Sequence, residues 1–224
     1  MTSQPASPPA ALAAILRGVE RGVFPAPDLS VTVIPAPFER DTCVIGLTAH
    51  IVVAADVDPA WVHRQLPPGD LSAPLNPPFL EALSKLTGRA VNAIDAMLLA
   101  PALTDAAERA ELTAGLTELT DHDHPRVRRA WQYRDNVRVY VDADGGLVLT
   151  GYGLAGRLEC ALEVPESSRG KGHGRRLAKT ARALAPTDSH VWAQVTPGNA
   201  ASFRAFLAAG YLPVGSEALL TAMT

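Results

Sequence analysis

Apolar positions in the first half of the chain follow two different periods. Within Ala10–Arg21, leucine and valine recur every three or four residues, which predicts an amphipathic helix that Gly22 ends. The segments Leu29–Pro35 and Cys43–Val57 are rich in β-branched residues and predict strands. Helical spacing and capping residues predict further helices over Ala60–Leu66, Pro78–Thr87 and Thr104–Leu119, while Val91–Leu99 fits either a strand or a helix.

The second half alternates short apolar segments with turn residues. Asn136–Val141 and Leu147–Tyr152 predict two strands, because the sequence Asp-Ala-Asp-Gly-Gly between them favours a hairpin turn. A short helix is expected after Pro125. The remaining pattern predicts a strand over Leu158–Val164, a helix over Arg175–Leu184, a strand over His190–Val195 and a helix that Asn199 opens and Gly210 closes.

Composition adds few restrictions. The chain has 224 residues with 47% hydrophobic residues and a net charge of −3, which favours a globular protein over a disordered chain or a dedicated nucleic-acid binder. Its apolar runs are shorter than the roughly 20 residues that span a bilayer. Cys43 and Cys160 are too few for a disulfide scaffold. We therefore expect a cytoplasmic protein that has neither nucleic acid nor a membrane as its partner.

The composition changes near the middle of the chain. Residues 1–9 are rich in proline and lack signal-peptide features, so they are expected to form a flexible tail. The charged stretch Asp121–Arg129 has a connective character, and we place a domain boundary near residue 115. This predicts an N-terminal α+β region over residues 10–115 and a second domain over residues 116–224. His122 and His124 resemble a metal-binding tract, but a solvated connection is preferred because no further ligands lie nearby.

The densest candidate chemistry lies in the glycine-rich loop Arg169–Gly174. Glycines at positions 170, 172 and 174 allow successive backbone N–H groups to face one anion, and the predicted helix that follows adds its positive end. His173 is expected to contribute its backbone N–H rather than its ring. Hydrogen bonds to a charged group contribute about 1.5–3 kcal/mol each, so several of them predict a strong diphosphate site. The cations around the loop are Arg169, Lys171, Arg175 and Arg176, opposed by Glu166.

The spacing separates this loop from two common phosphate loops. A P-loop requires Ser or Thr after its lysine, but Lys171 is followed by Gly172. A dinucleotide-binding fingerprint requires a third glycine one position later than Gly174. The pattern Arg169-x-x-Gly172-x-Gly174, five residues after Val164, resembles the acetyl-CoA pyrophosphate loop of the GNAT superfamily of acyl-CoA-dependent N-acyltransferases.

A later stretch agrees with this resemblance. Asn199, Ser202, Gly210 and Tyr211 look like the superfamily motif in which an asparagine starts a helix that ends in glycine followed by an aromatic residue. Asn199 is also a good helix cap, which alone would explain it. The resemblance covers about residues 116–224 and implies a GNAT-like α/β (α+β) fold. Such a fold has a mixed, mostly antiparallel central sheet flanked by helices, here with the N-terminal α+β region packed against it.

The resemblance implies transfer of an acetyl group from acetyl-CoA to a primary amine by direct attack, without a metal. Acetyl-CoA would lie in a V-shaped opening between the strand ending at Val164 and the strand His190–Val195, where backbone groups polarise the thioester. The donor-binding residues that it implies are Val164, Arg169, Gly170, Lys171, Gly172, His173, Gly174, Arg175 and Asn199. The acceptor is a small-molecule or peptide amine, and a longer acyl-CoA donor and a homodimer through a sheet edge stay open.

A base would help, since an alkyl amine has a pKa of about 10.4. Glu159 and Glu163 alternate to one side of their predicted strand and are candidates, directly or through water, with ordinary solvent-facing residues as the alternative reading. Cys160 is a poor nucleophile candidate because no histidine is near it in sequence.

Two features depart from the resemblance. Phe206 stands where the superfamily often has a tyrosine that protonates the departing thiolate, and phenylalanine has no proton to give. Either another group or water supplies that proton, or the chain is a catalytically weak acyl-CoA-binding or sensing module, which is the alternative function. The N-terminal region has no comparable motif. It is interpreted as a degenerate second copy of the same fold or as a separate α+β cap.

Overall fold

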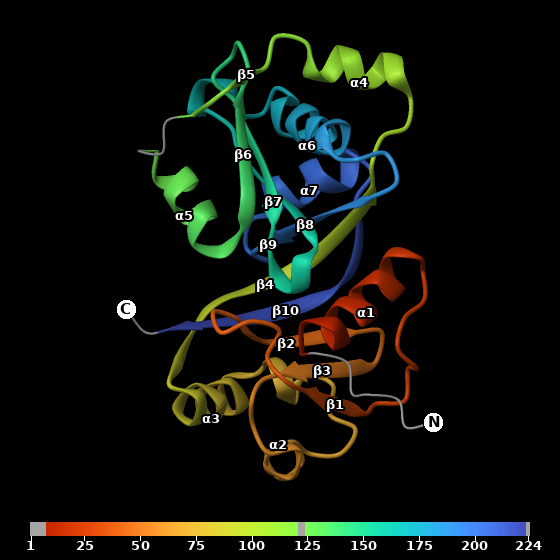
Figure 1. Cartoon of the computed structure of the whole chain (residues 1–224), viewed down its shortest axis with the longest axis vertical. Coiled ribbons are helices and arrows are strands. Elements are labelled where there is room, and N and C mark those ends of the chain that lie inside the picture. The colour runs from red at the N-terminus through yellow and green to blue at the C-terminus, as the bar shows by residue number, and fades with distance from the viewer. Residues whose placement is uncertain (1–7, 121–123, 223–224) are drawn as a thin grey trace. The chain divides into compact units, whose positions relative to one another are not determined.

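The computed structural model in Figure 1 describes residues 8–120 and 124–222. These residues form two compact units. The first unit contains the described residues up to Met97 and those from Val214 onward, and the second is Leu98–Pro213. The domain division near residue 115 is a different division and stays a prediction. Residues 1–7 of the expected tail lie outside the described residues, as does His122.

The first unit contains a small sheet and several helices. Its strands have the order β1-β3-β2-β10, in which β1 is parallel to β3 and the other two pairs are antiparallel. The elements are α1 (Pro8–Glu20), β1 (Val31–Ile34), β2 (Thr42–Leu47), β3 (His50–Ala54), α2 (Pro59–Gln65), the 3-10 turn η1 (Ala73–Leu75), α3 (Pro77–Thr87) and β10 (Leu212–Ala222). Strand β4 (Arg89–Pro101) has residues in both units, and the first two residues of β10 belong to the second unit.

Local sequence explains most boundaries in the first unit. Asp58 caps α2 by accepting a hydrogen bond from the backbone N–H of Ala60 at 2.9 Å, and a proline follows it at the first helical position. Helix α3 ends at Gly88, whose φ of 67° is left-handed. The single apolar run Cys43–Val57 forms two strands, because Thr48 and Ala49 turn the chain with positive φ. The ambiguous segment Val91–Leu99 lies in strand β4.

A buried histidine joins strands β1 and β3 of the first unit. His50 Nε2 lies 2.9 Å from Thr32 Oγ1, and its Nδ1 lies 3.1 Å from Asp28 Oδ1 and 3.2 Å from Ser30 Oγ. Hydrogen bonds from Ser30 and then from His50 lower the pKa of Asp28 to about 2. Apolar side chains of α2 and α3 cover a face of this sheet and form its core with Val44, Val53, Ala218 and Leu220.

In the second unit the strands follow the order β9-β8-β7-β6-β5, and β4 is hydrogen-bonded on the other side of β9. β8 and β9 are parallel and the pairs from β8 to β5 are antiparallel, so the expected mixed, mostly antiparallel sheet flanked by helices is confirmed. The elements are α4 (Ala106–Thr113), β5 (Thr117–Glu118), α5 (Pro125–Tyr133), β6 (Asp135–Val141), β7 (Leu147–Tyr152), η2 (Leu154–Gly156), β8 (Leu158–Glu163), η3 (Glu166–Ser168), α6 (His173–Leu184), β9 (His190–Val195) and α7 (Ala200–Ala208).

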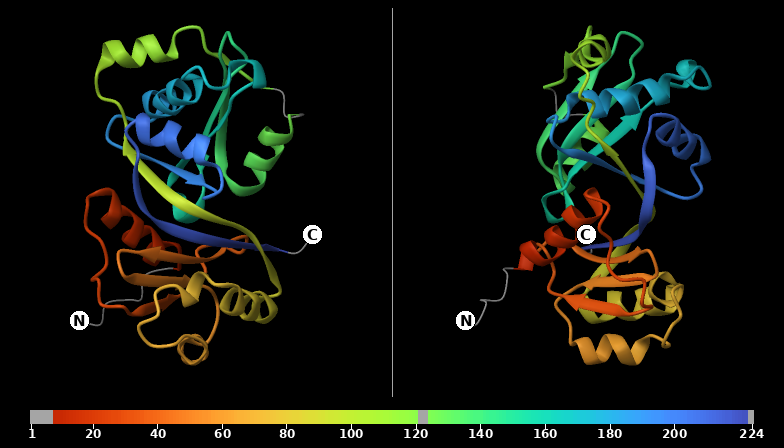
Figure 2. Two further views of the ribbon diagram at one scale, coloured as in Figure 1. Left: turned by 180° about the vertical axis from the view of Figure 1, so that it is seen from behind. Right: turned by 90° about the vertical axis from the view of Figure 1, so that its right-hand side faces the viewer.

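Helices cover both faces of the second sheet, as Figure 2 shows. Apolar residues of α6 and α7 pack on the face that includes Cys160, whereas Val127 and Ala130 of α5 pack on the face that includes Leu149. Helix α4 ends at Thr113, six residues before the expected end at Leu119, and the chain then forms β5. None of the helices in the described residues combines the length and apolar character that crossing a bilayer requires.

Candidate functional site

The parallel strands β8 and β9 pair over only part of their length. Glu159 pairs with Trp192 and Cys160 with Ala193, yet β8 continues to Glu163 and β9 to Val195. Within this described stretch the pairing ends at Cys160, at the place where the resemblance implies an opening for the donor. Backbone groups that leave a sheet ladder need other partners, because each carries a hydrogen-bonding donor or acceptor.

The glycine-rich loop continues from β8 through η3 to the start of α6. Gly170 and Gly172 have φ of 74° and 82°, and a Cβ built on either would meet no atom within 4 Å. Helix α6 begins at His173, two residues before the start that its apolar pattern predicts. Its first N–H groups have no partner within the helix and can bind an anion, as at any helix N-terminus.

The cations of the loop differ in their surroundings. Arg169 donates a long 3.4 Å hydrogen bond to the carbonyl oxygen of Val164, and Lys171 donates one of 2.9 Å to that of Ser167. Both side chains belong to exposed residues, as does Arg175. Single exposed contacts of this kind contribute little, so a bound anion could replace them.

The ring of His173 points away from solvent into a buried ionic cluster. His173 Nε2 and an Arg176 nitrogen each lie 2.6 Å from Asp142 Oδ2. Burial alone would raise the pKa of Asp142, but the hydrogen bonds from His173 and the Gly146 N–H, together with both neighbouring charges, hold it below its usual value. From the sequence, Asp142 is expected only as a turn residue, since the hairpin pattern explains it without any partner.

Asp142, Asp144 and His173 are the group among the described residues whose ligand atoms lie close enough to hold a metal ion, all within 4.8 Å of one another. The guanidinium of Arg176 already contacts both carboxylates, at 2.6 Å and 3.6 Å. Its positive charge already neutralises the two carboxylates, as a bound metal ion would otherwise do. The arrangement therefore favours an ionic cluster over a metal centre.

Glu159 is enclosed by two arginines. Its carboxylate oxygens lie 2.8 Å from Arg134 Nε and 2.8 Å from Arg157 Nε, and it accepts a further hydrogen bond from the Leu154 N–H. Burial alone would raise the pKa of Glu159, but the two guanidinium groups outweigh it and hold the pKa below its usual value. A buried carboxylate that stays ionised between two cations is a weak base.

Glu163 is more accessible. Its side chain is 43% exposed and forms an ion pair with Arg126 Nε at 2.7 Å. The hydrogen bond from Arg126 is the main reason that the pKa of Glu163 is lowered. Both glutamates contact cations from α5 or the residue after it, which agrees with their predicted alternation to the Ala161 side of the strand.

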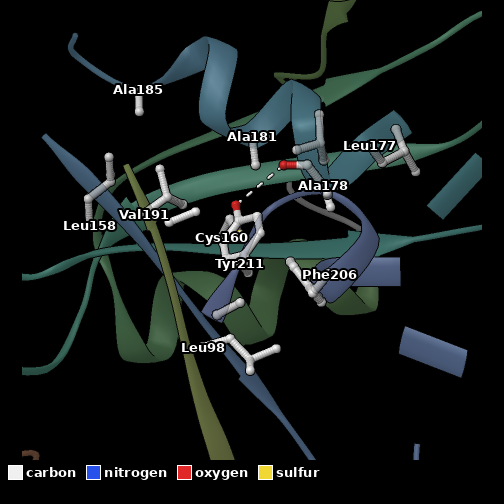
Figure 3. Close-up of a cluster of buried hydrophobic side chains, with 14 of the residues drawn as sticks. Leu98, Leu158, Cys160, Leu177, Ala178, Ala181, Ala185, Val191, Phe206 and Tyr211 are labelled. Carbon is white, nitrogen blue, oxygen red and sulfur yellow. Dashed lines mark hydrogen bonds between the residues drawn. The ribbon is translucent and has the colours of Figure 1, made fainter. Parts of the chain in front are cut away.

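The opposite side of β8 is a closed apolar core (Figure 3). Cys160 Sγ lies 3.5 Å from the hydroxyl of Tyr211, which donates a hydrogen bond to the Ala178 carbonyl oxygen at 3.3 Å. Burial raises the pKa of Cys160 to about 12, which agrees with its assessment as a poor nucleophile candidate. Phe206 packs edge-to-face on Tyr211 with 4.9 Å between ring centroids. The buried Tyr211 hydroxyl is therefore no substitute for the missing acid.

Asn199 caps helix α7. Its side-chain oxygen accepts a hydrogen bond from the Ser202 N–H at 3.1 Å, and Gly210 follows the helix with φ of 89°. The helix-cap interpretation is confirmed. A role for Asn199 toward a donor stays a prediction.

Comparisons with known proteins give only distant likenesses. No family model matches the chain, and no curated protein matches it. One similar solved structure is described as a GNAT-family acetyltransferase from Novosphingobium aromaticivorans, with 17% identity, a TM-score of 0.40, and coverage of 61% of this chain and 69% of that one. A GCN5-related N-acetyltransferase from Kribbella flavida has 17% identity and a TM-score of 0.36, with coverage of 64% and 63%.

A conserved protein of unknown function from Staphylococcus epidermidis has 13% identity and a TM-score of 0.40, with coverage of 66% of this chain and 68% of that one. The chain thus spans about two-thirds of the length of these proteins. Such identities and TM-scores carry no argument about activity.

Proposed function

We propose that the protein is an acyl-CoA-dependent N-acetyltransferase, with the donor diphosphate bound at the start of α6. The observation that carries the proposal is the exposed loop with left-handed glycines at positions 170 and 172, which leads directly into a helix N-terminus. Open space in front of both glycines would allow a diphosphate to approach the backbone. The exposed cations Arg169, Lys171 and Arg175 would supply charge.

The thioester would extend from this loop toward the unpaired ends of β8 and β9. There the backbone at Val164 could donate a hydrogen bond to the thioester carbonyl, and it would strengthen as charge develops on that oxygen. The acceptor nitrogen attacks the carbonyl carbon, the C–N bond forms and the C–S bond breaks. Water supplies the proton that the departing CoA thiolate takes up, since Phe206 has none to give.

Of the two candidate bases, the surroundings favour Glu163. Its half-exposed carboxylate could accept the amine proton through a water molecule, whereas Glu159 is buried and paired with two arginines. The lowered pKa of Glu163 makes it a modest base, so its expected contribution is at the lower end of general-base effects, about a hundredfold. Glu159 would then support β8 rather than act on the substrate.

The alternative function is an acyl-CoA-binding or sensing module without efficient turnover. The absence of a tyrosine at Phe206 is the observation that favours it. Replacing Phe206 by tyrosine is a poor test, because a hydroxyl added in this core would lack solvent and cost about 1–3 kcal/mol if left unpaired.

Release of free CoA separates the two functions. The protein is mixed with acetyl-CoA and a panel of primary amines and short peptides, and the appearance of thiol is followed with time. An enzyme gives amine-dependent thiol release that the Glu163→Gln variant slows. Tight acetyl-CoA binding with no amine-dependent release across the panel would favour the binding module.

A further inference from the structure

We propose that Asp142 is the positioning residue of the donor loop, fixing the start of α6 from the β6–β7 hairpin. The inference rests on the proposed donor site, because it assigns the group that orients that site. No local sequence signal connects Asp142 with the loop, which lies about thirty residues away along the chain.

Asp142 uses both carboxylate oxygens. Oδ1 accepts hydrogen bonds from the backbone N–H groups of Asp144 at 3.1 Å and Gly146 at 2.8 Å, which fixes the carboxylate within the hairpin turn. Oδ2 contacts His173 and Arg176 at 2.6 Å each, the first and fourth residues of α6. One buried carboxylate therefore joins the hairpin to the first turn of the helix.

The imidazole ring of His173 packs closely against Gly146 of the β6–β7 hairpin. A Cβ on Gly146 would lie 2.5 Å from His173 Nε2 and 3.0 Å from Asp142 Oδ2. Glycine is needed here for space, since any side chain would displace the imidazole. The ring is also buried, with 6% of its side-chain surface exposed.

This cluster determines what the loop can present to an anion. With the imidazole turned into the hairpin, His173 can offer only its backbone N–H on the outer side, directly after the left-handed Gly172. Arg176 is held by one nitrogen while 46% of its side chain stays exposed, so its remaining N–H groups can reach solvent. The cluster thus orients a backbone donor and a guanidinium together, which preorganises binding.

The test compares ligands that contain a diphosphate with one that lacks it. Binding of acetyl-CoA, inorganic pyrophosphate and S-acetylpantetheine is measured by calorimetry for wild type and Asp142→Asn, alongside thermal unfolding. Positioning predicts an affinity loss of about tenfold or more for acetyl-CoA and pyrophosphate. It predicts unchanged binding of S-acetylpantetheine, and a raised KM for acetyl-CoA with little change in kcat. A merely structural role would weaken all three ligands alike or none.

Asp144→Asn is the matched control. Asp144 lies in the same turn, but its side chain is exposed and its distance to Arg176 is 3.6 Å, against 2.6 Å for Asp142. It should bind all three ligands as wild type does. If Asp142→Asn does not fold, Gly146→Ala provides the second variant, since its methyl group displaces the ring while keeping every charge. It should show the same selective loss.

The outcomes separate this inference from the proposed function. Wild-type protein that binds neither acetyl-CoA nor pyrophosphate overturns the donor site itself. Wild-type binding that Asp142→Asn and Gly146→Ala leave unchanged overturns only the role of Asp142. A metal-dependent cluster would instead lose pyrophosphate binding on chelation with EDTA, which would also overturn the positioning role proposed for Arg176 and Asp142.

Discussion

The two glutamates on one side of β8 have contrasting surroundings at the residue scale. Glu159 is buried between Arg134 and Arg157, whereas Glu163 shares a half-exposed ion pair with Arg126. Glu159 therefore has the surroundings of a residue that supports the fold, whereas Glu163, four positions later, is accessible to solvent. Their difference gives a direct test of which one supports the fold.

Glu159→Gln should destabilise the protein by about 3–5 kcal/mol, because it removes the charge of a buried carboxylate that forms ion pairs with Arg134 and Arg157. Glu163→Gln, as the control, should cost no more than about 1 kcal/mol, as is usual for surface ion pairs. Urea unfolding followed by circular dichroism measures both. Equal costs would contradict the structural role of Glu159.

The lowered pKa of Asp28 predicts how stability changes in acid. A carboxyl whose pKa is about 2 in the folded protein stabilises the fold above its unfolded pKa of about 3.9, and this stabilisation is lost as pH falls toward 2. The stability difference between wild type and Asp28→Asn should therefore be constant near neutrality and shrink between about pH 4 and pH 2. Denaturant unfolding across that range tests it, and a difference independent of pH would argue against the His50 cluster.

Residue types with a local role were predictable from sequence, and those with distant partners were not. Asn199 and Asp58 have their cap function in the adjacent backbone, so the pattern indicates it. The role of Asp142 depends on contacts with side chains of helix α6. The role of Arg157 depends on its burial beside Glu159. No spacing rule contains that information.

At the scale of elements, the candidate site depends on where β8 leaves its neighbour β9. The ladder between them ends at Cys160 and Ala193, and β8 then leads into the glycine loop and α6. Glu163 is the last residue of β8, on this unpaired end. If Glu163 acts as a base at this position, the effect of replacing it on the rate of acetyl transfer should depend on pH.

Glu163→Gln should slow acetyl transfer more near pH 7 than near pH 9. The free amine is about a hundred times more abundant at the higher pH for an acceptor with a pKa of about 10.4, so less base catalysis is needed. Initial rates with a fixed amine at both pH values measure this, and Glu163→Asp should restore part of the rate. The same fold-loss at both pH values would contradict general-base catalysis.

Sequence patterns identified most elements but not every boundary. The hairpin turn at Asp142–Gly146 and the start of α5 at Pro125 were predicted, because turn residues and proline act locally. Cys43–Val57 forms two strands because Thr48 and Ala49 adopt positive φ and turn the chain. Threonine and alanine rarely adopt positive φ, so the sequence does not predict this turn. Helix α4 ends before the expected Leu119 because Gly115 is left-handed, a glycine signal that the apolar pattern over Thr104–Leu119 does not take into account.

At the scale of the whole molecule, the end of the chain returns to the first unit. Strand β10 pairs antiparallel with β2, with Leu220 opposite Thr42 and Ala218 opposite Val44. The pairing joins residues that are between 170 (Ser216 and Gly46) and 178 (Leu220 and Thr42) positions apart along the chain, and neither local periodicity nor capping predicts such a partner. The first unit is therefore incomplete without residues from the C-terminal end of the chain.

Leu220→Ala should destabilise the protein by about 2–5 kcal/mol, because its side chain is fully buried in the core of the first unit. Leu212→Ala in the same strand is the matched control, since Leu212 is 68% exposed, and it should cost less than about 0.5 kcal/mol. Denaturant unfolding of both variants tests whether β10 supports the first unit. Equal effects would contradict that arrangement.

The central claim is that the loop before α6 binds the diphosphate of acetyl-CoA. Calorimetric titration with acetyl-CoA tests it most directly, comparing wild type, Gly172→Val and Gly115→Val. Both glycines have positive φ, 82° and 75°, and open space at the Cβ position, so the two variants carry similar backbone strain.

The account predicts micromolar binding by wild type and by Gly115→Val, and an affinity at least about tenfold lower for Gly172→Val, equivalent to about 1.4 kcal/mol. Equal affinities of the two variants would contradict the assignment of the loop. An absence of binding by wild type would contradict the proposed function as a whole.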